Sequence, residues 1–388
     1  MRSRLLTLAL AAVLAHPTDV AAQSRVVRIA SKALGETRVV HISVPPNYRL
    51  AKQRYPVVLL LDGQVRPFFD LAVATAGYDL IGNMREFAMP QQIVVGVEQG
   101  DRSADLARND VAFTRFLTEE LLPYVDREYR TLPFRTLIGH SLAGRFALLT
   151  LCRAPDQFSA TVAISPSVSD SVSLAVMSCV RQQAGTASAR MRQLVLSAGS
   201  VETRSMAGVQ RLVQFFRDSV AAPWRVRRVD GEGLGHTETP LATIPAGLRS
   251  VFATEVWEIA RPAADSLLMR LGEPQRVLDP ALAVVSTRLG FRVEPSPKWM
   301  AEVVRGYLKH GPADSAVAAA RRMTAAYPED VLGYALLADA QLAKRDNAAA
   351  RRALVEGLSM VDKVAWFDET QREIQRAHFR SSLDGIPP

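Results

Sequence analysis

Hydrophobic and polar positions form two kinds of pattern in the first two thirds of the chain. Apolar and polar side chains alternate early on, which is typical of strands with one face in solvent. Apolar strand patterns then alternate with segments of helical spacing, which predicts βαβ units and a mostly parallel sheet. The alternating strands are 26–29 and 39–44; the later strands are 56–61, 93–97, 136–138, 160–164, 193–198 and 224–229; the helices are 68–80, 113–124, 142–149, 210–220 and 241–259. The predicted fold class is therefore α/β.

The pattern changes at Leu267, after which strand signals end and alanine-rich helical patterns take over. Internal similarity recurs there at a period of 34 residues, so that Val303 matches Leu337 and Ala316 matches Ala350. Small residues at such fixed places let two helices pack closely. The period and the small residues resemble tetratricopeptide repeats.

This resemblance implies two repeat-like units within 297–362, a degenerate one at 297–328 and a clearer one at 331–362. Residues 365–380 are expected to form a final capping helix. Two units fall short of the three or so that an independent array needs, so we expect them to pack on the main domain or on flanking helices. An unrelated helical bundle is the alternative.

The N-terminus has the pattern of a signal peptide. Arg2 and Arg4 precede an apolar run at 5–15, and small residues at 20–22 precede a plausible cleavage site at Gln23. The run is shorter than the ~20 residues of a spanning helix. We expect cleavage and a periplasmic or secreted mature protein with no membrane span; an uncleaved anchor is the alternative.

These patterns divide the chain into a signal peptide at 1–22, an α/β domain at 23–262 and a helical region at 263–388. Hydrophobic residues make up 48% of the chain and charged residues 22%, which excludes a bias toward disorder. The net charge of +8 favours anionic partners only weakly. We expect no nucleic-acid partner, because no basic tract is interleaved with aromatic residues.

A serine stands where a predicted strand turns into a predicted helix. The turn reads Gly-His-Ser-Leu-Ala-Gly over 139–144, a G-x-S-x-[G/A] pattern in the strand–turn–helix context of a nucleophile elbow. Ser141 is the predicted nucleophile, and the N–H of Leu142 would face a developing oxyanion. Ala143 stands where a second glycine is usual, and it adds only a methyl group. The alternative is an ordinary turn with a serine N-cap.

A serine nucleophile needs a base and an acid that orients it. His236 lies in a glycine-rich loop after a late strand and is the predicted base. His140 adjoins the nucleophile, and its side chain should point away from Ser141. Glu202 follows the strand before the histidine strand, which gives the order serine, acid, histidine expected of α/β-hydrolases.

Several alternatives remain open for the acid and for the oxyanion site. Glu238 and Glu232 lie close to His236 in sequence, and Asp230 is a further candidate acid. A second oxyanion N–H is expected from Gly63 or Gln64, at the tip of the first buried strand.

The chain has two cysteines, Cys152 and Cys179, and no pattern of metal ligands. We expect Cys152 to be a buried thiol; a bridge to Cys179, which export permits, is the alternative. No pair of histidines, cysteines and carboxylates has the spacing of a metal site, so we expect neither a metal nor a cofactor.

The segment from about Tyr55 to Phe252 resembles the "putative esterase" family of α/β-hydrolases. That family includes trilactone siderophore esterases, esterase-D type enzymes, and feruloyl and acetyl-xylan esterases. The resemblance covers about half the chain and runs in order. It is carried by residues 60–64, 94–97, 102, 105–106, 116–124, 139–142 and 164–167 and by the Glu202 and His236 segments.

The resemblance is closest to the siderophore-esterase-like subgroup, some exported members of which carry a helical, repeat-like C-terminal extension. It makes Arg102, His140 and Ser167 candidates for substrate contacts. The family often has tryptophans where this chain has Val168 and Ser169. Their absence argues against aromatic catecholate substrates.

The function expected from the sequence is therefore that of an exported serine carboxyl-ester hydrolase acting on a small-molecule ester through an acyl-enzyme. One alternative is an exported acyltransferase on the same fold. Another is a partner-binding protein whose repeats hold a protein or peptide and whose hydrolase domain is vestigial.

Overall fold

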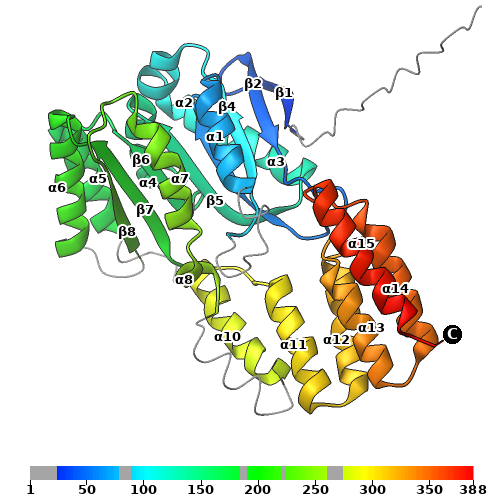
Figure 1. Cartoon of the computed structure of the whole chain (residues 1–388). Helices are drawn as coiled ribbons and strands as arrows, with labels where there is room; N and C mark the ends of the chain where they lie inside the picture. Colours follow the sequence, from blue (N-terminus) through cyan, green and yellow to red (C-terminus); the bar gives the residue numbers. More distant parts are fainter. Residues whose placement is uncertain (1–23, 78–88, 184–189, 220–223, 260–273, 388) are drawn as a thin grey trace, which may run out of the picture.

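The computed structural model describes residues 24–77, 89–183, 190–219, 224–259 and 274–387. One eight-stranded sheet runs through its larger part, and a group of helices lies beside it (Figure 1). The strand order is β1-β2-β4-β3-β5-β6-β7-β8. The predicted signal peptide, the junction at 262–263 and residues 78–80 of a predicted helix lie outside the described residues. Within those ranges, no helix is long and apolar enough to cross a membrane.

The strands run parallel from β4 to β8, and β1 and β2 join antiparallel at one edge. This confirms the predicted α/β-hydrolase type of sheet. The strands are β1 (Ser24–Ser31), β2 (Glu36–Ser43), β3 (Tyr55–Leu61), β4 (Ile93–Val97), β5 (Thr131–His140), β6 (Ala160–Ile164), β7 (Arg192–Gly199) and β8 (Trp224–Gly231).

Helices cover both faces of the sheet because its central strands are apolar on both. Val58 and Leu60 of β3 pack in one cluster with α1 (Arg66–Gly77) and α7 (Thr239–Val251). The residues between them face the opposite side. That side is covered by η2 (Ala104–Arg108), α2 (Asp110–Arg115), η3 (Phe116–Leu121), α3 (Leu122–Glu128), α4 (Leu142–Arg153), α5 (Asp170–Gln183) and α6 (Thr203–Ser219). In Figure 1, α1 and α7 lie in front of the sheet, with α4, α5 and α6 behind it.

The structure differs from the predicted helices in three places. The amphipathic segment at 113–124 is not one regular helix, because the π-helical turn η3 separates α2 from α3. The helix predicted at 241–259 ends at Val251, and a separate turn of helix, α8 (Thr254–Trp257), follows. Helix α5 was not predicted from the sequence at all.

The C-terminal part is entirely helical and packs directly on the α/β part. Trp299 and Val303 belong to the same apolar cluster as Val58 and Ile244 of the sheet side. Near its other end, the Ala365 N–H donates to Oδ1 of Asn47 at 2.7 Å. The helices are α10 (Pro274–Leu289), α11 (Pro297–His310), α12 (Ala313–Ala326), α13 (Leu332–Ala343), α14 (Asn347–Val361) and α15 (Glu369–Asp384).

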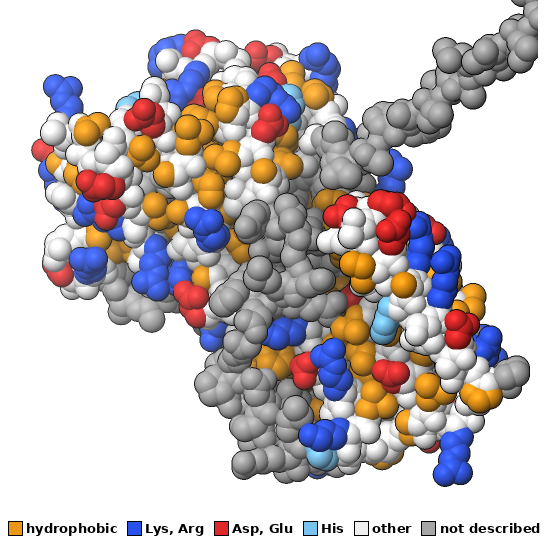
Figure 2. All heavy atoms as spheres, in the orientation of Figure 1, with side chains coloured by type: hydrophobic (Ala, Val, Ile, Leu, Met, Phe, Trp, Pro, Cys, Tyr) orange, Lys and Arg blue, Asp and Glu red, His pale blue; other side chains and the backbone are white. Residues whose placement is uncertain are grey.

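The helical extension is thus confirmed, and its pairs α11–α12 and α13–α14 fall within the predicted units 297–328 and 331–362. Their assignment as tetratricopeptide-like repeats remains a prediction. On the face seen in Figure 2, side chains of both charge signs are interspersed over the sheet part and the helical part alike.

Cys152 and Cys179 form a disulfide that joins α4 to α5. The expected buried thiol is therefore wrong, and the alternative of a bridge is correct. The two cysteines are 27 residues apart in sequence, and their Cα atoms are 5.8 Å apart, a usual span for a disulfide. This approach of the two cysteines could not be predicted from the sequence, because it depends on how α5 packs against α4.

Candidate active site

The turn between β5 and α4 holds Ser141 in a strained backbone conformation. Its φ of 59° lies in the left-handed region, which non-glycine residues rarely adopt. The turn requires small neighbours, because a Cβ at Gly139 would lie 2.3 Å from the carbonyl oxygen of Ala143. The Ser141 N–H donates to the Ile164 carbonyl at 2.9 Å, which fixes the turn against β6. Ser141 therefore sits on a nucleophile elbow, as the sequence pattern indicates.

The structure brings the three predicted catalytic residues together in one chain of contacts. Nε2 of His236 lies 2.8 Å from Oγ of Ser141. Nδ1 of the same ring lies 2.5 Å from Oε2 of Glu202. A carboxylate can only accept, so Nδ1 carries the proton and Nε2 faces the serine as an acceptor. This is the arrangement in which an imidazole can take a proton from a hydroxyl.

The Glu202 carboxylate is held in its ionised form. Burial raises its pKa, but hydrogen bonds outweigh that effect and lower the pKa to about 2. Its Oε1 accepts from the Ser165 hydroxyl at 2.6 Å and from the Gly199 N–H at 2.9 Å. The Thr239 hydroxyl lies 3.1 Å from the same oxygen. Glu202 is therefore anionic at neutral pH, and a carboxylate in this position can stabilise an imidazolium beside it.

The alternative acids are occupied elsewhere or exposed. Oε2 of Glu238 accepts the N–H of Gly235 at 2.9 Å, within the histidine loop. Asp230 pairs with Arg228 at 2.5 Å, and Glu232 is exposed. Of the four candidates, Glu202 is the one in contact with the His236 ring.

Two backbone N–H groups, which follow the neighbouring strands β3 and β5, are candidates for an oxyanion site. The N–H of Leu142 opens α4, and that of Gln64 follows β3; among the described residues neither has an acceptor. The Gly63 N–H already donates to the Val97 carbonyl at 2.8 Å, which leaves Gln64 as the available donor of the two predicted. Gly63 is needed for another reason, since a Cβ there would lie 2.5 Å from the carbonyl carbon of Gly96.

Arg102 follows β4, and its charge is already paired with that of Asp62. Its guanidinium donates twice to the buried carboxylate of Asp62, at 2.7 and 2.8 Å. A third bond, at 3.1 Å, runs to the carbonyl of His140. Arg102 thus ties the turn after β3 to the turn after β5. To make the predicted contact with a substrate, Arg102 would have to keep these three hydrogen bonds and bind the substrate as well.

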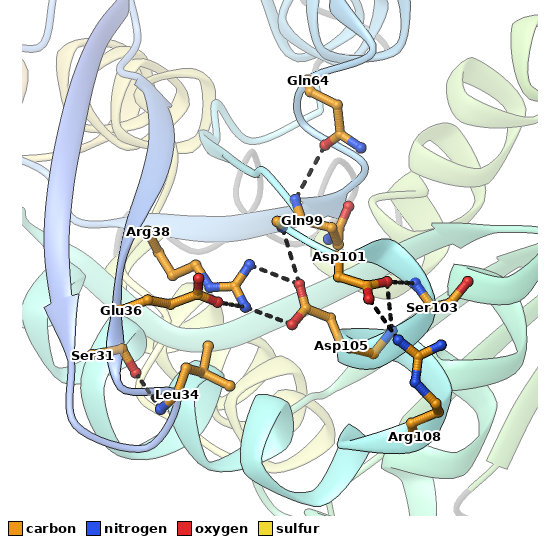
Figure 3. A network of polar contacts seen from close by, with 12 residues as sticks. Ser31, Leu34, Glu36, Arg38, Gln64, Gln99, Asp101, Ser103, Asp105 and Arg108 are labelled. Atoms are coloured by element: carbon orange, nitrogen blue, oxygen red, sulfur yellow. Dashed lines mark hydrogen bonds and ion pairs between the residues drawn. The ribbon is translucent and has the colours of Figure 1, made fainter.

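The loop that carries Arg102 is fixed by a buried ion pair. Arg38 donates two hydrogen bonds to Asp105, at 2.7 and 2.5 Å, and both side chains are almost fully buried. The Gly100 N–H donates to the same carboxylate (Figure 3). At the start of the loop, Oε1 of Gln99 accepts the Asp62 N–H at 2.8 Å. The 99–108 loop is therefore rigidly joined to both β2 and the turn after β3.

His140 and Ser167 occupy different positions around the nucleophile. Ser167 is exposed, and its N–H donates to the Ser141 carbonyl at 3.1 Å. The His140 ring turns toward the histidine loop, where its Nε2 lies 2.8 Å from the His236 carbonyl. Burial and the nearby His236 lower the pKa of His140, so this ring is neutral at pH 7.

The sequence did not indicate which residues hold Glu202, nor which residue holds Asp62 in the turn after β3. Ser165, Thr239 and Gly199 converge on Glu202 from separate elements, and Gln99 reaches Asp62 from another. One available signal was position, since Ser165 directly follows β6, as Ser141 follows β5. Both have positive φ, at 40° and 59°.

Among the described residues, no group of three or more histidine, cysteine or carboxylate side chains could hold a metal ion.

Comparisons with known proteins agree with this fold. In curated sequences, 157 residues are 31% identical to the uncharacterized protein YjcH of Bacillus subtilis, covering 38% of this chain and 62% of that protein. In a separate match, 57 residues of this chain are 44% identical to the ferri-bacillibactin esterase BesA of Bacillus subtilis, covering 14% of this chain and 20% of BesA. The chain thus matches about three fifths and one fifth of these two relatives.

Two crystal structures show the same fold. An IroE-like serine hydrolase from Shewanella oneidensis is 20% identical and superposes with a TM-score of 0.62, over 78% of this chain and 99% of its own. An uncharacterised protein from Capnocytophaga ochracea is 17% identical, with a TM-score of 0.57 over 92% of this chain and 100% of its own. That second match extends into the C-terminal helices.

The family model described as "Putative esterase" matches residues 31–236, just over half of the chain and the segment that contains Ser141, Glu202 and His236. The chain therefore belongs to this esterase family.

Proposed function

We propose that this chain is an exported serine carboxyl-ester hydrolase that works through a covalent acyl-enzyme. The observation that carries the proposal is the continuous contact from Ser141 Oγ through the His236 ring to Glu202, at 2.8 and 2.5 Å. Membership of the esterase family supports the same reaction.

In the proposed reaction, Ser141 Oγ attacks the ester carbonyl while Nε2 of His236 takes its proton. The anionic Glu202 stabilises the imidazolium that results. The N–H groups of Leu142 and Gln64 stabilise the oxyanion of the tetrahedral intermediate. The imidazolium then protonates the leaving alcohol. Water, deprotonated by the same imidazole, releases the acid and restores the serine.

Export is supported by the N-terminal sequence pattern and by the disulfide. Disulfides persist in oxidising compartments and are rare in the cytosol. The Cys152–Cys179 bridge fits a periplasmic or secreted protein. Sequencing the N-terminus of the mature protein from the cell envelope or medium tests this, with a start at Gln23 as the expected result.

The reaction is tested by fluorophosphonate labelling followed by mass spectrometry of the labelled peptide. We expect modification of Ser141, no labelling in Ser141→Ala, and a fall of at least about a hundredfold in the rate for His236→Ala, since a general base supplies about 10²–10⁴. Hydrolysis of an activated ester should follow the same order.

A folded Ser141→Ala variant that hydrolyses the ester at the parent rate would refute the proposed mechanism. Circular dichroism and the thermal midpoint of each variant show whether the fold is intact. Labelling of a serine other than Ser141 would also contradict it.

A further inference from the structure

The loop that carries His236 is rich in glycine and needs to be held in place. Glycines at 231, 233 and 235 precede the histidine, and Gly233 has a φ of 70°. Glycine leaves the backbone a wide choice of conformations, so such a loop does not fix a side chain by itself. The His236 side chain is 43% exposed, which leaves little packing to restrain it.

Most hydrogen bonds of this loop are made within the loop itself or to the turn after β7. The Gly233 N–H donates to the Ser200 hydroxyl at 2.8 Å, and the Gly235 N–H donates to Glu238 at 2.9 Å. Apart from the catalytic contact with Ser141, the described residues provide one hydrogen bond from this loop to the nucleophile turn. That bond joins Nε2 of His140 to the backbone carbonyl of His236, at 2.8 Å.

The chemistry of this bond fixes the His140 tautomer. A carbonyl oxygen can only accept, so Nε2 of His140 carries the proton and donates it. The neutral ring then has no proton on Nδ1. The two imidazole rings lie 4.7 Å apart, and Phe68 packs edge-on against His140 at 5.8 Å.

His140 is itself held from behind. Its carbonyl accepts the third hydrogen bond of Arg102 at 3.1 Å, and Arg102 is paired with the buried carboxylate of Asp62. The ionisable groups that act on the His140 ring are His236, Asp62 and Arg102. A connected path thus runs from the turn after β3, through Arg102 and His140, to the main chain of His236.

We propose that His140 is a positioning residue, which sets the distance between His236 and Ser141 through its hydrogen bond to the His236 carbonyl. The inference rests on the proposed function of Ser141 and His236. It replaces the substrate contact expected of His140 with an indirect role. A small displacement of a reacting group lowers the reaction rate strongly. Loss of the hydrogen bond at the His236 carbonyl should therefore slow acylation more than it weakens substrate binding.

Two near-isosteric variants separate the hydrogen bond from the volume of the side chain. His140→Gln retains an N–H donor at about the position of Nε2, and His140→Met fills similar space without one. We expect His140→Met to lower the fluorophosphonate labelling rate and kcat by about five- to tenfold, and His140→Gln to stay within about threefold of the parent. KM and the thermal midpoint should be nearly the same in both.

Equal labelling rates in the glutamine and methionine variants would overturn the proposal, whether both are slow or both are at the parent rate. A change in KM alone would instead assign His140 to substrate binding and would also overturn it.

The hydrogen bond has a test that needs no activity and no substitution. Nitrogen-15 NMR of the parent at neutral pH should show His140 as the Nε2–H tautomer. The Nδ1–H tautomer would refute the proposal even if the enzyme is active. If Ser141 is not labelled in the parent, the proposed function fails. An Nε2–H tautomer of His140 in that same protein would show that the hydrogen bond to His236 is nevertheless present.

Discussion

The Glu202 carboxylate is the most constrained titratable group of the site. Its pKa of about 2 lies below the usual 4.5, so the folded protein binds this proton more weakly than the unfolded chain. Unfolding therefore takes up a proton between about pH 4.5 and pH 2. The stability that Glu202 contributes is complete above the unfolded pKa and is lost as the pH falls through this interval.

This predicts a difference in acid sensitivity between the parent and Glu202→Gln. The free energy of unfolding of the parent should fall more steeply between pH 5 and pH 3 than that of the variant, because glutamine does not titrate. Urea unfolding at a series of pH values measures both slopes, and the other carboxylates are common to the two proteins. Parallel curves would mean that the folded pKa of Glu202 is not depressed.

At the same scale, the sequence was sufficient to single out the proposed catalytic residues, but not the groups that hold them in place. Ser141, His236 and Glu202 were predicted because each follows a recognisable strand, and the structure brings them into contact. The choice between Gly63 and Gln64 could not be made, because it depends on the Val97 carbonyl, which β4 brings beside Gly63. The contacts of Ser165 and Gln99 likewise depend on how the strands pair.

Among the elements, α4 begins directly after Ser141, the proposed nucleophile, and carries a disulfide-bonded cysteine near its other end. The bridge from Cys152 to Cys179 closes a loop of 27 residues between α4 and α5. Such a cross-link stabilises the folded protein mainly by restricting the unfolded chain.

Replacing both cysteines by alanine should lower the free energy of unfolding by about 3 kcal/mol. The activity of the folded variant should remain close to the parent's, because the bridge lies at the end of α4 away from Ser141. Urea unfolding measures the loss, and a reducing agent should reproduce it in the parent but leave the double variant unchanged. Equal stability of oxidised and reduced parent would contradict this expectation.

Two features could not be predicted because the local sequence pattern indicates them only weakly: helix α5 and the break between α7 and α8. Helix α5 buries Val172, Val176 and Val180 at intervals of four residues, but serines stand beside them at positions 171, 173 and 178. Serine competes for backbone hydrogen bonds and is a poor helix former. The break between α7 and α8 has neither glycine nor proline at Phe252–Ala253; it follows from the packing of Phe252 and Trp257 against Phe134.

At the scale of the whole molecule, the described helices of the C-terminal part pack directly on the sheet part. Trp299 of α11 is 3% exposed within the apolar cluster shared with the sheet. Its Nε1–H donates to Glu258, just after α8, at 2.7 Å. Burial raises the pKa of Glu258. The expected packing of the helical region on the main domain is borne out by these contacts.

Trp299→Ala should lower the free energy of unfolding by about 3–5 kcal/mol, because it leaves a large cavity between the two parts. Trp299→Phe keeps most of the packing but removes the N–H, and we expect a loss of about 1–3 kcal/mol from the unpaired Glu258. Urea unfolding followed by circular dichroism measures both.

The exposed Val284 of α10, which is 60% exposed, provides the control. Val284→Ala should change the stability by no more than about 0.5 kcal/mol. Two separate unfolding transitions in the parent would contradict a single packed unit.

The hydrogen bond between Asn47 and Ala365 spans 318 residues of sequence and has a consequence for biosynthesis. All eight strands are translated before α11, whose Trp299 and Val303 belong to the apolar cluster on the α1 and α7 side of the sheet. Until α11 has been made, the part of that cluster against which it packs is exposed and is a target for holding chaperones. A premature stop codon before α11 would therefore yield a substrate for proteases rather than a shorter enzyme.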